Sequence, residues 1–557
     1  MRTSLISTLK RMVNAAIQLH YNPKNISEHI ALLQHAKQIE QARKIEAAAL
    51  RQSQNKTDQT LTNYLAQAAR AGYSRRRFLS QAAQAAVAVG MGSLFTTACS
   101  STKKGQTAPR IAIIGAGIAG LNAAYHLQKA GYRAQVYEAS KRTGGRIFSG
   151  KNLMGDGLTT EIGAEFIDSW HSDMLDLAQT FNLEVFDALE DMNKDKLNPE
   201  LFLFSGQKYS EANAIAEIMP VVAKLIAHTK ELPDTINYQT MGKAKAFDLI
   251  SIEEYFGKIG INGWLKELFN VAFTGEYGLE IGEQSALNFL TLFDPNMENG
   301  KFSLFGDSDE RYKIKGGNQQ ITDQLTDKLQ NQISYEYTLE AIKNNTSGGY
   351  VLSFSNGKTV NADVVVLAIP FTILRQIDLQ IALPAIKKRA IDNLGYGTNS
   401  KLFIGTNNRL WREQGQAGFL YSNQIHTGWD NSQGQNGNKG TGAYTVFLGG
   451  QAGYDLAKEK AAQFHGSLDL AFEGFSQSLN NKTEAFNWAK YKHSQGSYSC
   501  YRIGQWTTIG GAEALPVGNL LFAGEHCSSV SAGFMNGGAE SGRMAAEQIM
   551  AMLNGVI

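Results

Sequence analysis

Residues 110–146 read RIAIIGAGIAGLNAAYHLQKAGYRAQVYEASKRTGGR, and this stretch decides the fold. The apolar run 111–114 predicts a buried β-strand, which passes directly into the glycine-rich turn 115–120. A helical segment over 121–129 and a second strand over 134–137 follow, and the second strand ends on Glu138. This order of strand, glycine turn, helix, strand and acid is typical of a dinucleotide-binding βαβ unit.

The three glycines of the turn stand where side chains would obstruct a bound dinucleotide. Gly115 allows the tight turn off the strand, Gly117 lets the backbone approach a pyrophosphate, and Gly120 lets the helix pack closely on the sheet. The N–H groups at the start of the helix attract phosphate. Glu138, 18 residues after Gly120, is placed to accept hydrogen bonds from ribose hydroxyls. The stretch therefore predicts a dinucleotide site.

The residues after the acid narrow the kind of dinucleotide. Gly144-Gly145-Arg146 adds flexible backbone and a guanidinium near the expected diphosphate. This order of motifs resembles that of the flavin amine oxidase family: GxGxxG, an acid and then GGR. The family includes monoamine, polyamine and L-amino acid oxidases. The resemblance implies FAD rather than NAD as the cofactor. Taken alone, the GGR residues also fit an ordinary basic turn.

Length and composition set limits on the class of protein. A chain of 557 residues with 43% hydrophobic content can bury at least two domain cores. A formal net charge of +2 gives no reason to expect a nucleic-acid partner. Three cysteines, at 99, 500 and 527, are too few and too scattered for a disulfide framework or a four-ligand zinc site, so we expect no metal. No uncharged run of the mature region reaches the ~20 residues of a membrane-spanning helix.

The first hundred residues resemble an export leader. Residues 1–73 predict a helical or loosely ordered extension, and 74–108 a twin-arginine signal with its linker, because SRRRFL precedes a small apolar stretch. A twin-arginine route exports folded proteins, which suits a cofactor acquired in the cytoplasm. The residues alone also fit a basic helix end leading into a buried helix. Thr96-Thr97-Ala98-Cys99 resembles a lipoprotein cleavage box, although Thr96 stands where a larger aliphatic residue is usual. We expect a periplasmic or lipid-anchored bacterial protein.

The segment 158–168 bears on the substrate. It resembles the E-x-G-A segment that passes beside the flavin ring in the family. Relatives that oxidise L-amino acids commonly carry an arginine just after this Gly-Ala, whereas this chain has Glu165 and Phe166. Asp168 falls where polyamine-oxidising relatives place an acid facing the substrate amine. The resemblance implies a cationic amine bound by Glu165 and Asp168, and the residues alone also fit a solvated turn.

Lys401 is the expected lysine near flavin N5. The segment 394–404 resembles the family segment that carries this residue, where it acts through an ordered water in reoxidation of the reduced flavin. A lysine inside an apolar strand is costly unless it has a partner. The alternative is a strand-edge lysine whose ammonium reaches solvent.

The last sixty residues carry three further motifs. Ser494–Tyr498 resembles the G-S-Y segment, and relatives with covalent FAD have cysteine at the position of Ser497, which implies noncovalent FAD here. The strand 520–526 ends on an acid that contacts the phosphate and ribityl region in relatives. GFMNG, 533–537, begins a helix whose N–H groups would point at flavin O2. Tyr498 and Phe534 match two aromatic positions in front of the flavin.

These motifs together imply an α/β fold. It consists of a Rossmann-like (GR2-type) FAD-binding domain, 109–168, 312–393 and 494–557, interleaved with an α+β substrate domain, 169–311 and 394–493. The segments 337–342, 350–355 and 359–369 are predicted as strands. The cofactor site so implied comprises Gly115, Gly117, Ile118, Ala119, Gly120, Glu138, Ala139, Gly145, Arg146, Leu339, Gly524, Glu525, Phe534 and Met535.

The function implied is FAD-dependent oxidative deamination of an amine. Lys401, Tyr498 and Phe534 are the expected catalytic residues, Tyr498 also binding substrate, with dioxygen or a quinone as electron acceptor. An L-amino acid oxidase or dehydrogenase is the close alternative, with Arg502 as carboxylate clamp. Two further alternatives are a desaturase of a polyene or porphyrinogen and a noncatalytic flavin-binding module. The sequence leaves the oligomeric state open, a homodimer included.

Overall fold

A parallel sheet holds the glycine-rich stretch at its centre. The computed structural model describes residues 108–293 and 304–555. In this part of the chain, β1 (Ile111–Ile114) lies in a five-stranded sheet of order β20-β13-β1-β2-β9. The partners of β1 are β13 (Val364–Leu367) and β2 (Ala134–Tyr137), and both pairings are parallel. The edge strands are β20 (Leu520–Phe522) and β9 (Ile333–Ser334).

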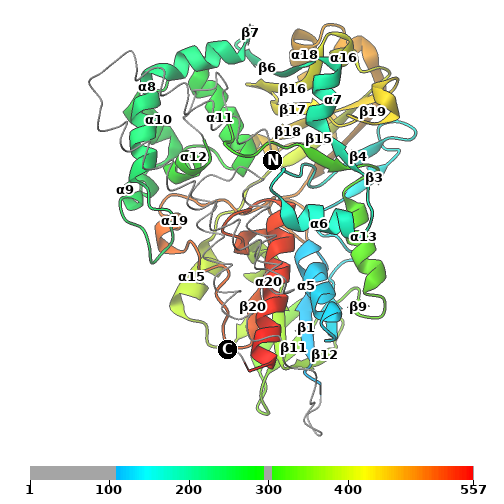
Figure 1. Cartoon of the computed structure of the whole chain (residues 1–557), viewed down its shortest axis with the longest axis vertical. Coiled ribbons are helices and arrows are strands. Elements are labelled where there is room, and N and C mark those ends of the chain that lie inside the picture. The colour runs from blue at the N-terminus through cyan, green and yellow to red at the C-terminus, as the bar shows by residue number, and fades with distance from the viewer. Residues whose placement is uncertain (1–107, 294–303, 556–557) are drawn as a thin grey trace, which may run out of the picture. The chain divides into compact units, whose positions relative to one another are not determined.

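Two helices pack together beside this sheet, α5 (Ile118–Lys129) and α20 (Met535–Leu553) (Figure 1). Close approach depends on glycine, because a Cβ at Gly542 would lie 2.1 Å from the Ala119 carbonyl oxygen. A Cβ at Gly120 would likewise lie 2.0 Å from the Gly115 carbonyl oxygen. The predicted strand-turn-helix-strand unit is therefore present, and its glycines serve the packing as expected.

A second, four-stranded sheet in the described region has the order β12-β11-β10-β14. Its strands are β10 (Leu339–Asn344), β11 (Tyr350–Phe354), β12 (Thr359–Ala362) and β14 (Asp378–Gln380). The prediction of one strand over 359–369 is wrong, because β12 and β13 belong to different sheets. The chain changes sheets at Asp363, whose carboxylate accepts hydrogen bonds from the backbone and guanidinium of Arg110.

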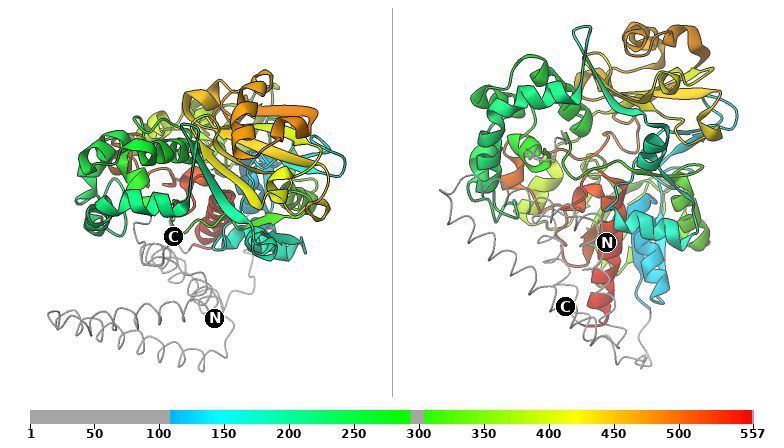
Figure 2. Two further views of the ribbon diagram at one scale, coloured as in Figure 1. Left: turned by 90° about the horizontal axis from the view of Figure 1, so that it is seen from above. Right: turned by 45° about the horizontal axis from the view of Figure 1, so that its top comes forward.

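The largest sheet among the described residues has seven strands, in the order β19-β15-β18-β17-β16-β6-β7. The strands are β6 (Asn198–Phe204), β7 (Gln207–Tyr209), β15 (Ser400–Thr406), β16 (Gln416–Ser422), β17 (His426–Asp430), β18 (Gly442–Leu448) and β19 (Leu479–Asn487). Beside it lie the helices α8 (Glu211–Glu231), α10 (Ile252–Ile259), α11 (Gly263–Tyr277) and α12 (Ala286–Leu292) (Figure 2). Among these, α11 packs directly on β6, β16, β17 and β18.

The remaining elements connect these sheets. The strands are β3 (Ser149–Lys151), β4 (Thr159–Glu161), β5 (Val185–Asp187) and β8 (Tyr312–Ile314), which form the pairs β3-β4 and β5-β8. The α-helices are α6 (Ser172–Thr180), α7 (Ala188–Asp195), α9 (Ala244–Asp248), α13 (Gln319–Lys328), α14 (Phe371–Leu374), α15 (Ala385–Asn393), α16 (Leu410–Glu413), α17 (Gly450–Tyr454), α18 (Ala462–Ala471) and α19 (Gln505–Thr508). Short 3-10 turns are η2 (Asn436–Asn438), η3 (Lys458–Lys460), η4 (Phe475–Ser478) and η5 (Glu525–Cys527).

Each of the two larger sheets draws on separated parts of the chain. The parallel sheet takes its strands from 111–137, 333–367 and 520–522, and the seven-stranded sheet takes them from 198–209 and 400–487. The exact domain boundaries stay a prediction. The leader, with the extension 1–73 and Cys99, lies outside the described residues.

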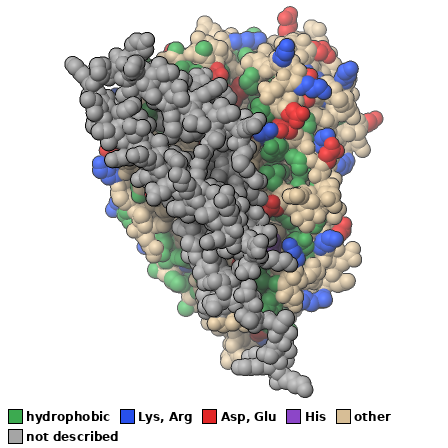
Figure 3. Space-filling view, in the orientation of Figure 1, with side chains coloured by type: hydrophobic (Ala, Val, Ile, Leu, Met, Phe, Trp, Pro, Cys, Tyr) green, Lys and Arg blue, Asp and Glu red, His purple; other side chains and the backbone are tan. Residues whose placement is uncertain are grey.

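The surface of the described part is mixed in charge. On the face that Figure 3 shows, basic and acidic side chains are interspersed, in agreement with the net charge of +2. Over the described ranges, no helix combines the length and the apolar character that crossing a membrane requires.

Candidate active site

Glu138 is fixed to the glycine turn at the carboxyl edge of the parallel sheet. Its Oε2 accepts a 2.8 Å hydrogen bond from the Ala116 backbone N–H, and its Oε1 accepts one of 2.8 Å from Ser140. Gly115 has φ +101°, a conformation that favours glycine, and a Cβ there would lie 2.6 Å from the Ala368 carbonyl oxygen. The end of β2, with Ala139 next to Glu138, is thus held against the turn where dinucleotides bind.

The backbone around the two glycine motifs forms a cradle without side chains. The N–H of Gly144 donates to the Ala116 carbonyl at 2.8 Å, and a Cβ at Gly145 would lie 3.2 Å from the Gly117 Cα. The helices α5 and α20 both begin without a hydrogen bond from the side chain of the N-cap residue. Such a cradle with two helix N-termini fits the diphosphate and flavin of FAD. Ile118, Ala119 and Met535 stand in the first turns of these helices.

Glu525 joins three motifs that are far apart in the sequence. Its Oε1 accepts a 2.9 Å bond from Arg146 Nη1, and its Oε2 accepts bonds from the Ser499 hydroxyl (2.8 Å) and the Gly533 N–H (2.9 Å). Arg146 also donates to the Ser497 carbonyl at 2.7 Å. Burial opposes ionisation of Glu525, but the Arg146 guanidinium and the Ser499 bond hold its pKa below the ordinary value. GGR, G-S-Y and the start of α20 therefore meet at one buried carboxylate.

Two other predicted cofactor residues lie in the same region. Leu339 on β10 is buried in a core cluster with Ile114 and Tyr137. Gly524 has φ +140°, and its N–H donates to the Ser541 hydroxyl at 2.9 Å, which ties the end of β20 to α20. Contact of Leu339 with adenine stays a prediction.

Lys401 is buried and fully bonded. It lies in β15, between β18 and β19, with 5% of its surface exposed. Its Nζ donates to the carbonyls of Glu161 (3.1 Å) and Gly163 (2.8 Å) and to Glu165 Oε2 (2.9 Å). An ammonium has three N–H donors, and these acceptors account for all of them. The alternative of a lysine reaching solvent is therefore wrong.

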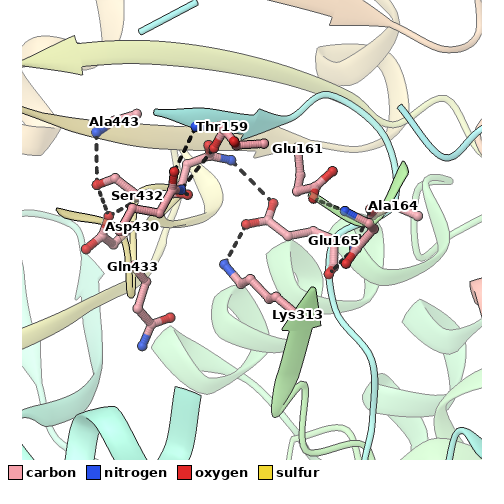
Figure 4. Close-up of polar contacts among 12 residues, drawn as sticks. Thr159, Glu161, Ala164, Glu165, Lys313, Asp430, Ser432, Gln433 and Ala443 are labelled. Carbon is pink, nitrogen blue, oxygen red and sulfur yellow. Dashed lines mark hydrogen bonds and ion pairs between the residues drawn. The ribbon is translucent and has the colours of Figure 1, made fainter. Parts of the chain in front are cut away.

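Glu165 lies between two lysines. Its Oε1 accepts a 2.7 Å hydrogen bond from Lys313 Nζ on β8 (Figure 4), while its Oε2 bonds Lys401. Burial raises the pKa of Glu165, but the two ammonium groups outweigh burial and leave the pKa below its ordinary value. The alternative of a solvated turn is wrong for this residue. Substrate binding by Glu165 stays a prediction, since both oxygens are engaged by the protein.

Sequence reasoning missed Lys313. It stands on β8 in the run Tyr312-Lys313-Ile314-Lys315, where period-two alternation would put both lysines on the same face of a strand. Lys313 is 8% exposed, whereas Lys315 pairs with Glu184 at the surface. The two lysines differ because β8 ends at Ile314, before Lys315, so alternation gave no signal for the burial of Lys313.

Asp168 is completely buried, so the solvated-turn alternative fails here too. Its Oδ1 accepts a 2.9 Å bond from the Glu310 N–H, and its own N–H donates to His171 Nδ1 at 2.8 Å. The carboxylate thereby fixes the loop that leads into β8. Direct contact of Asp168 with a substrate amine stays a prediction.

Three further acids, which we call the acidic wall, are Glu200, Glu276 and Glu310: Glu310 interacts electrostatically with the other two, and both Glu276 and Glu310 interact with Asp168. Each is half-buried. Burial raises the pKa of Glu200 and of Glu276 to about 7, with Asp168 adding to the shift of Glu276. Burial, followed by Glu276 and Asp168, raises the pKa of Glu310 well above its ordinary value. Burial therefore disfavours the charged form of all three carboxyl groups. No motif marks these acids, because they come from β6, α11 and the loop before β8.

The two predicted aromatic residues lie next to this acidic wall. Tyr498 donates to the Gly275 carbonyl at 3.2 Å, beside Glu276, and burial together with Glu276 raises its pKa. A Cβ at Gly533 would lie 3.5 Å from the Tyr498 ring, and Phe534 follows directly. The Phe534 ring lies 4.9 Å from that of His171. Tyr498 and Phe534 thus both border the start of α20.

A second aromatic group surrounds the lysines and was also missed from the sequence. The Trp429 ring lies 5.1 Å from Lys401 Nζ and 5.3 Å from the Phe166 ring. Phe419 and Phe447 pack on the same indole. Phe166, Phe419 and Phe447 each keep some accessible surface, so they form an apolar wall.

The structure shows the surroundings of Ser497, Cys500 and Arg502. Ser497 has no thiol for a flavin bond, and its hydroxyl donates to Asn399 at 2.6 Å. Cys500 is buried against Asn288. Arg502 pairs at the surface with Glu283, each side chain being 43% exposed, which does not suit the proposed carboxylate clamp.

Comparisons with known proteins show the family of this chain. Residues 118–550 match the family described as flavin containing amine oxidoreductase. An L-amino acid dehydrogenase of Synechocystis is 24% identical over 79% of this chain and 94% of its own length. The dog amine oxidase [flavin-containing] B is 22% identical over 79% of this chain and 86% of its own length.

Solved structures show the same fold. Cyclohexylamine oxidase from Brevibacterium oxydans superposes with a TM-score of 0.70 at 21% identity, over 80% of this chain and all of that one. A putrescine oxidase gives a TM-score of 0.66 at 19% identity, over 80% of this chain and 99% of that one. The α/β flavoprotein fold expected from the sequence is confirmed. The chain belongs to the flavin-containing amine oxidoreductase family and is an FAD-dependent enzyme that oxidises amines.

Proposed function

We propose that the substrate is a positively charged amine without an α-carboxylate. The observation that carries this proposal is the acidic wall of Glu200, Glu276 and Glu310 beside Tyr498. Acids gathered in one place attract a cation and repel a substrate carboxylate when they are ionised, and a bound cation in turn favours their ionised form. FAD supplies the redox chemistry by accepting a hydride from the carbon next to nitrogen.

The basic groups at the site support the same conclusion. Lys313 and Lys401 share Glu165, and Arg146 is paired with Glu525. A substrate carboxylate would have to displace one of these protein carboxylates. Phe166, which stands where amino acid oxidases commonly carry arginine, presents only an aromatic ring.

The aromatic residues orient the amine. The hydroxyl of Tyr498 is anchored to the Gly275 carbonyl, which fixes the ring plane, while Phe534 is packed on His171. Aromatic faces attract an incoming ammonium and then hold its neutral form. The imine product hydrolyses, and we propose dioxygen or a quinone as the final electron acceptor.

An L-amino acid substrate is the second candidate. Two similar proteins carry names of this kind, the Synechocystis dehydrogenase and a putative L-amino-acid oxidase of Bacillus subtilis, 24% identical. The cation in contact with Phe166 is Lys313, whose Nζ lies 4.7 Å from the ring centroid, close to the position where an arginine was expected. A substrate carboxylate that replaced Glu165 at Lys313 would be bound there.

Anaerobic reduction of the bound flavin separates the candidates. Matched pairs differ only in the α-carboxylate: cadaverine and lysine, phenethylamine and phenylalanine. Loss of the visible flavin absorbance with the amines alone supports the proposal. Reduction by the amino acids alone overturns it in favour of the second candidate, and reduction by neither overturns both in favour of a noncatalytic module or a desaturase.

We further propose export by the twin-arginine route to the periplasm, with a lipid on Cys99, and a homodimer as the assembled form. The support is the sequence of the leader, SRRRFL and TTAC. Replacing Arg75 and Arg76 by lysine should leave the protein in the cytoplasmic fraction, and Cys99→Ala should release it from membranes. Export of the double variant would contradict the route. Light scattering measures the assembly state, and a monomeric mass would contradict the dimer.

A further inference from the structure

Lys313 and Lys401 approach one carboxylate from two different strands. Lys313 Nζ lies 2.7 Å from Glu165 Oε1 and Lys401 Nζ lies 2.9 Å from Glu165 Oε2. The side chains are 9%, 6% and 2% exposed for Lys313, Lys401 and Glu165. Two buried ammonium groups therefore share a single anion.

This arrangement constrains what Lys401 does. All three of its N–H donors are taken by Glu161, Gly163 and Glu165, so no donor remains for a water molecule. Lys401 is held as a fixed charge in one position.

The group lies beside the cofactor cradle. The Gly163 carbonyl that binds Lys401 belongs to a segment whose neighbour Ala164 donates to the Arg146 carbonyl at 3.1 Å. A Cβ at Gly163 would lie 2.0 Å from that same carbonyl oxygen. Arg146 in turn bonds Glu525 at the start of α20. The lysines and the cradle are thus joined through one short stretch of backbone.

Charge counting then gives Lys313 a role. Lys401 and Glu165 alone would cancel, and the site beside the cradle would carry no net charge. With Lys313 the three groups sum to one positive charge. The other titratable groups near them are Glu161, from the end of β4, whose pKa burial raises to about 7, and Glu310, from the loop before β8. Asn431 and Trp429, from β17 and the residue after it, are neutral.

We propose that Lys313 is a positioning residue that acts through Glu165. It offsets the Glu165 charge, so that Glu165 can anchor Lys401 while the site keeps the positive charge that stabilises an anion at the flavin. The inference rests on the family's FAD chemistry and deepens the proposed function.

The test measures the affinity for sulfite, an anion that adds to the flavin of many oxidases and bleaches its visible absorbance. Lys313→Met leaves a net charge of zero and should weaken sulfite binding roughly tenfold, the order expected for one unit charge across a protein interior. Glu165→Gln leaves two positive charges and should tighten binding by a similar factor. The double variant restores one charge and should return to the wild-type affinity.

Matched controls keep the outcome clear. Lys315→Met removes a lysine two residues away that pairs with Glu184 at the surface, and it should leave sulfite affinity unchanged. Lys401→Met should weaken binding, and it should slow flavin reoxidation far more than anaerobic reduction by substrate. If Glu165 and Lys313 only support the fold, the double variant will be the weakest binder, and this result overturns the proposal.

The readout is also independent of the substrate. Sulfite titration needs only bound FAD, so it still reports on the lysines if no amine reduces the flavin. If Glu165→Gln fails to fold, Lys313→Met and the double variant still decide between the two readings. A wild-type affinity in Lys313→Met alone would also refute the charge count.

Discussion

Glu525→Gln should weaken both the fold and the retention of FAD. The carboxylate accepts from Arg146, the Ser499 hydroxyl and the Gly533 N–H at 2.8–2.9 Å, and 6% of its side chain is exposed. The amide keeps the shape but removes the charge, and it places an NH₂ opposite one of these donors. Arg146 is then left as a cation without its anion.

The size of the loss follows from this burial. Breaking a buried ion pair by removing one partner costs about 3–5 kcal/mol. The Arg146 side chain keeps 24% exposure, which points to the lower end, about 3 kcal/mol. An unfolding entropy of ~2.1 cal/mol/K per residue gives ~1 °C per kcal/mol for a chain of 557 residues, so this loss corresponds to a fall of roughly 3 °C in Tm. The Arg110–Asp363 pair, 51% and 40% exposed, is the matched surface pair, and Asp363→Asn should cost no more than about 1 kcal/mol.

The assay is thermal unfolding of the holoprotein, followed by flavin fluorescence, with FAD retention measured by gel filtration. The pKa of Glu525 is depressed, so its stabilisation is present above the unfolded pKa near ~4.3 and is lost as pH falls through the lower folded value. The wild type should therefore lose stability over that range more steeply than Glu525→Gln. A Tm within 1 °C of wild type, as expected of Asp363→Asn, would refute the reasoning, which predicts a fall of about 3 °C.

Two further predictions concern helix packing and pH. Gly542→Ala should destabilise the protein by about 1–3 kcal/mol, because the new Cβ would lie 2.1 Å from the Ala119 carbonyl oxygen. Gly466→Ala is the control: this exposed glycine of α18 has nothing within 4 Å of a Cβ, and the substitution should stabilise the protein by about 0.5–1 kcal/mol. Thermal unfolding measures both, and equal Tm shifts would contradict the packing argument. KM for a cationic amine should fall roughly fivefold as pH rises through about 7, because Glu276 becomes anionic there. Glu276→Gln should flatten this pH dependence of KM, whereas the control Glu280→Gln, at an exposed position, should not. Steady-state kinetics from pH 6 to 8 measure the dependence. An unchanged pH dependence in Glu276→Gln would mean that Glu276 does not face the amine.

The elements around the cofactor were predictable because they depend on local chemistry. The βαβ unit follows from glycines with required conformations, and the burial of Lys401 with a partner follows from the cost of an unpaired charge. The split of the predicted strand 359–369 was not predictable, because it depends on a bond from Asp363 to Arg110, far away in the sequence.

The acidic wall escaped prediction for a different reason. Glu200, Glu276 and Glu310 come from a strand, a helix and a loop, and each one alone looks like an ordinary surface acid. Only the tertiary fold brings Glu200 and Glu276 close to Glu310. Lys313 was hidden in the same way, since its partner Glu165 lies 148 residues earlier in the chain.

The position of β20 and α20 late in the sequence determines when FAD can bind during synthesis. The glycine turn is made early, but the edge strand 520–522, Glu525 and the second helix N-terminus are made long after it. Domains generally fold as units as their segments leave the ribosome. The cofactor site is therefore incomplete until α20 has been made. A chain truncated before β20 keeps the whole GxGxxG motif and lacks half of the cradle, so tight FAD binding marks a molecule that contains α20.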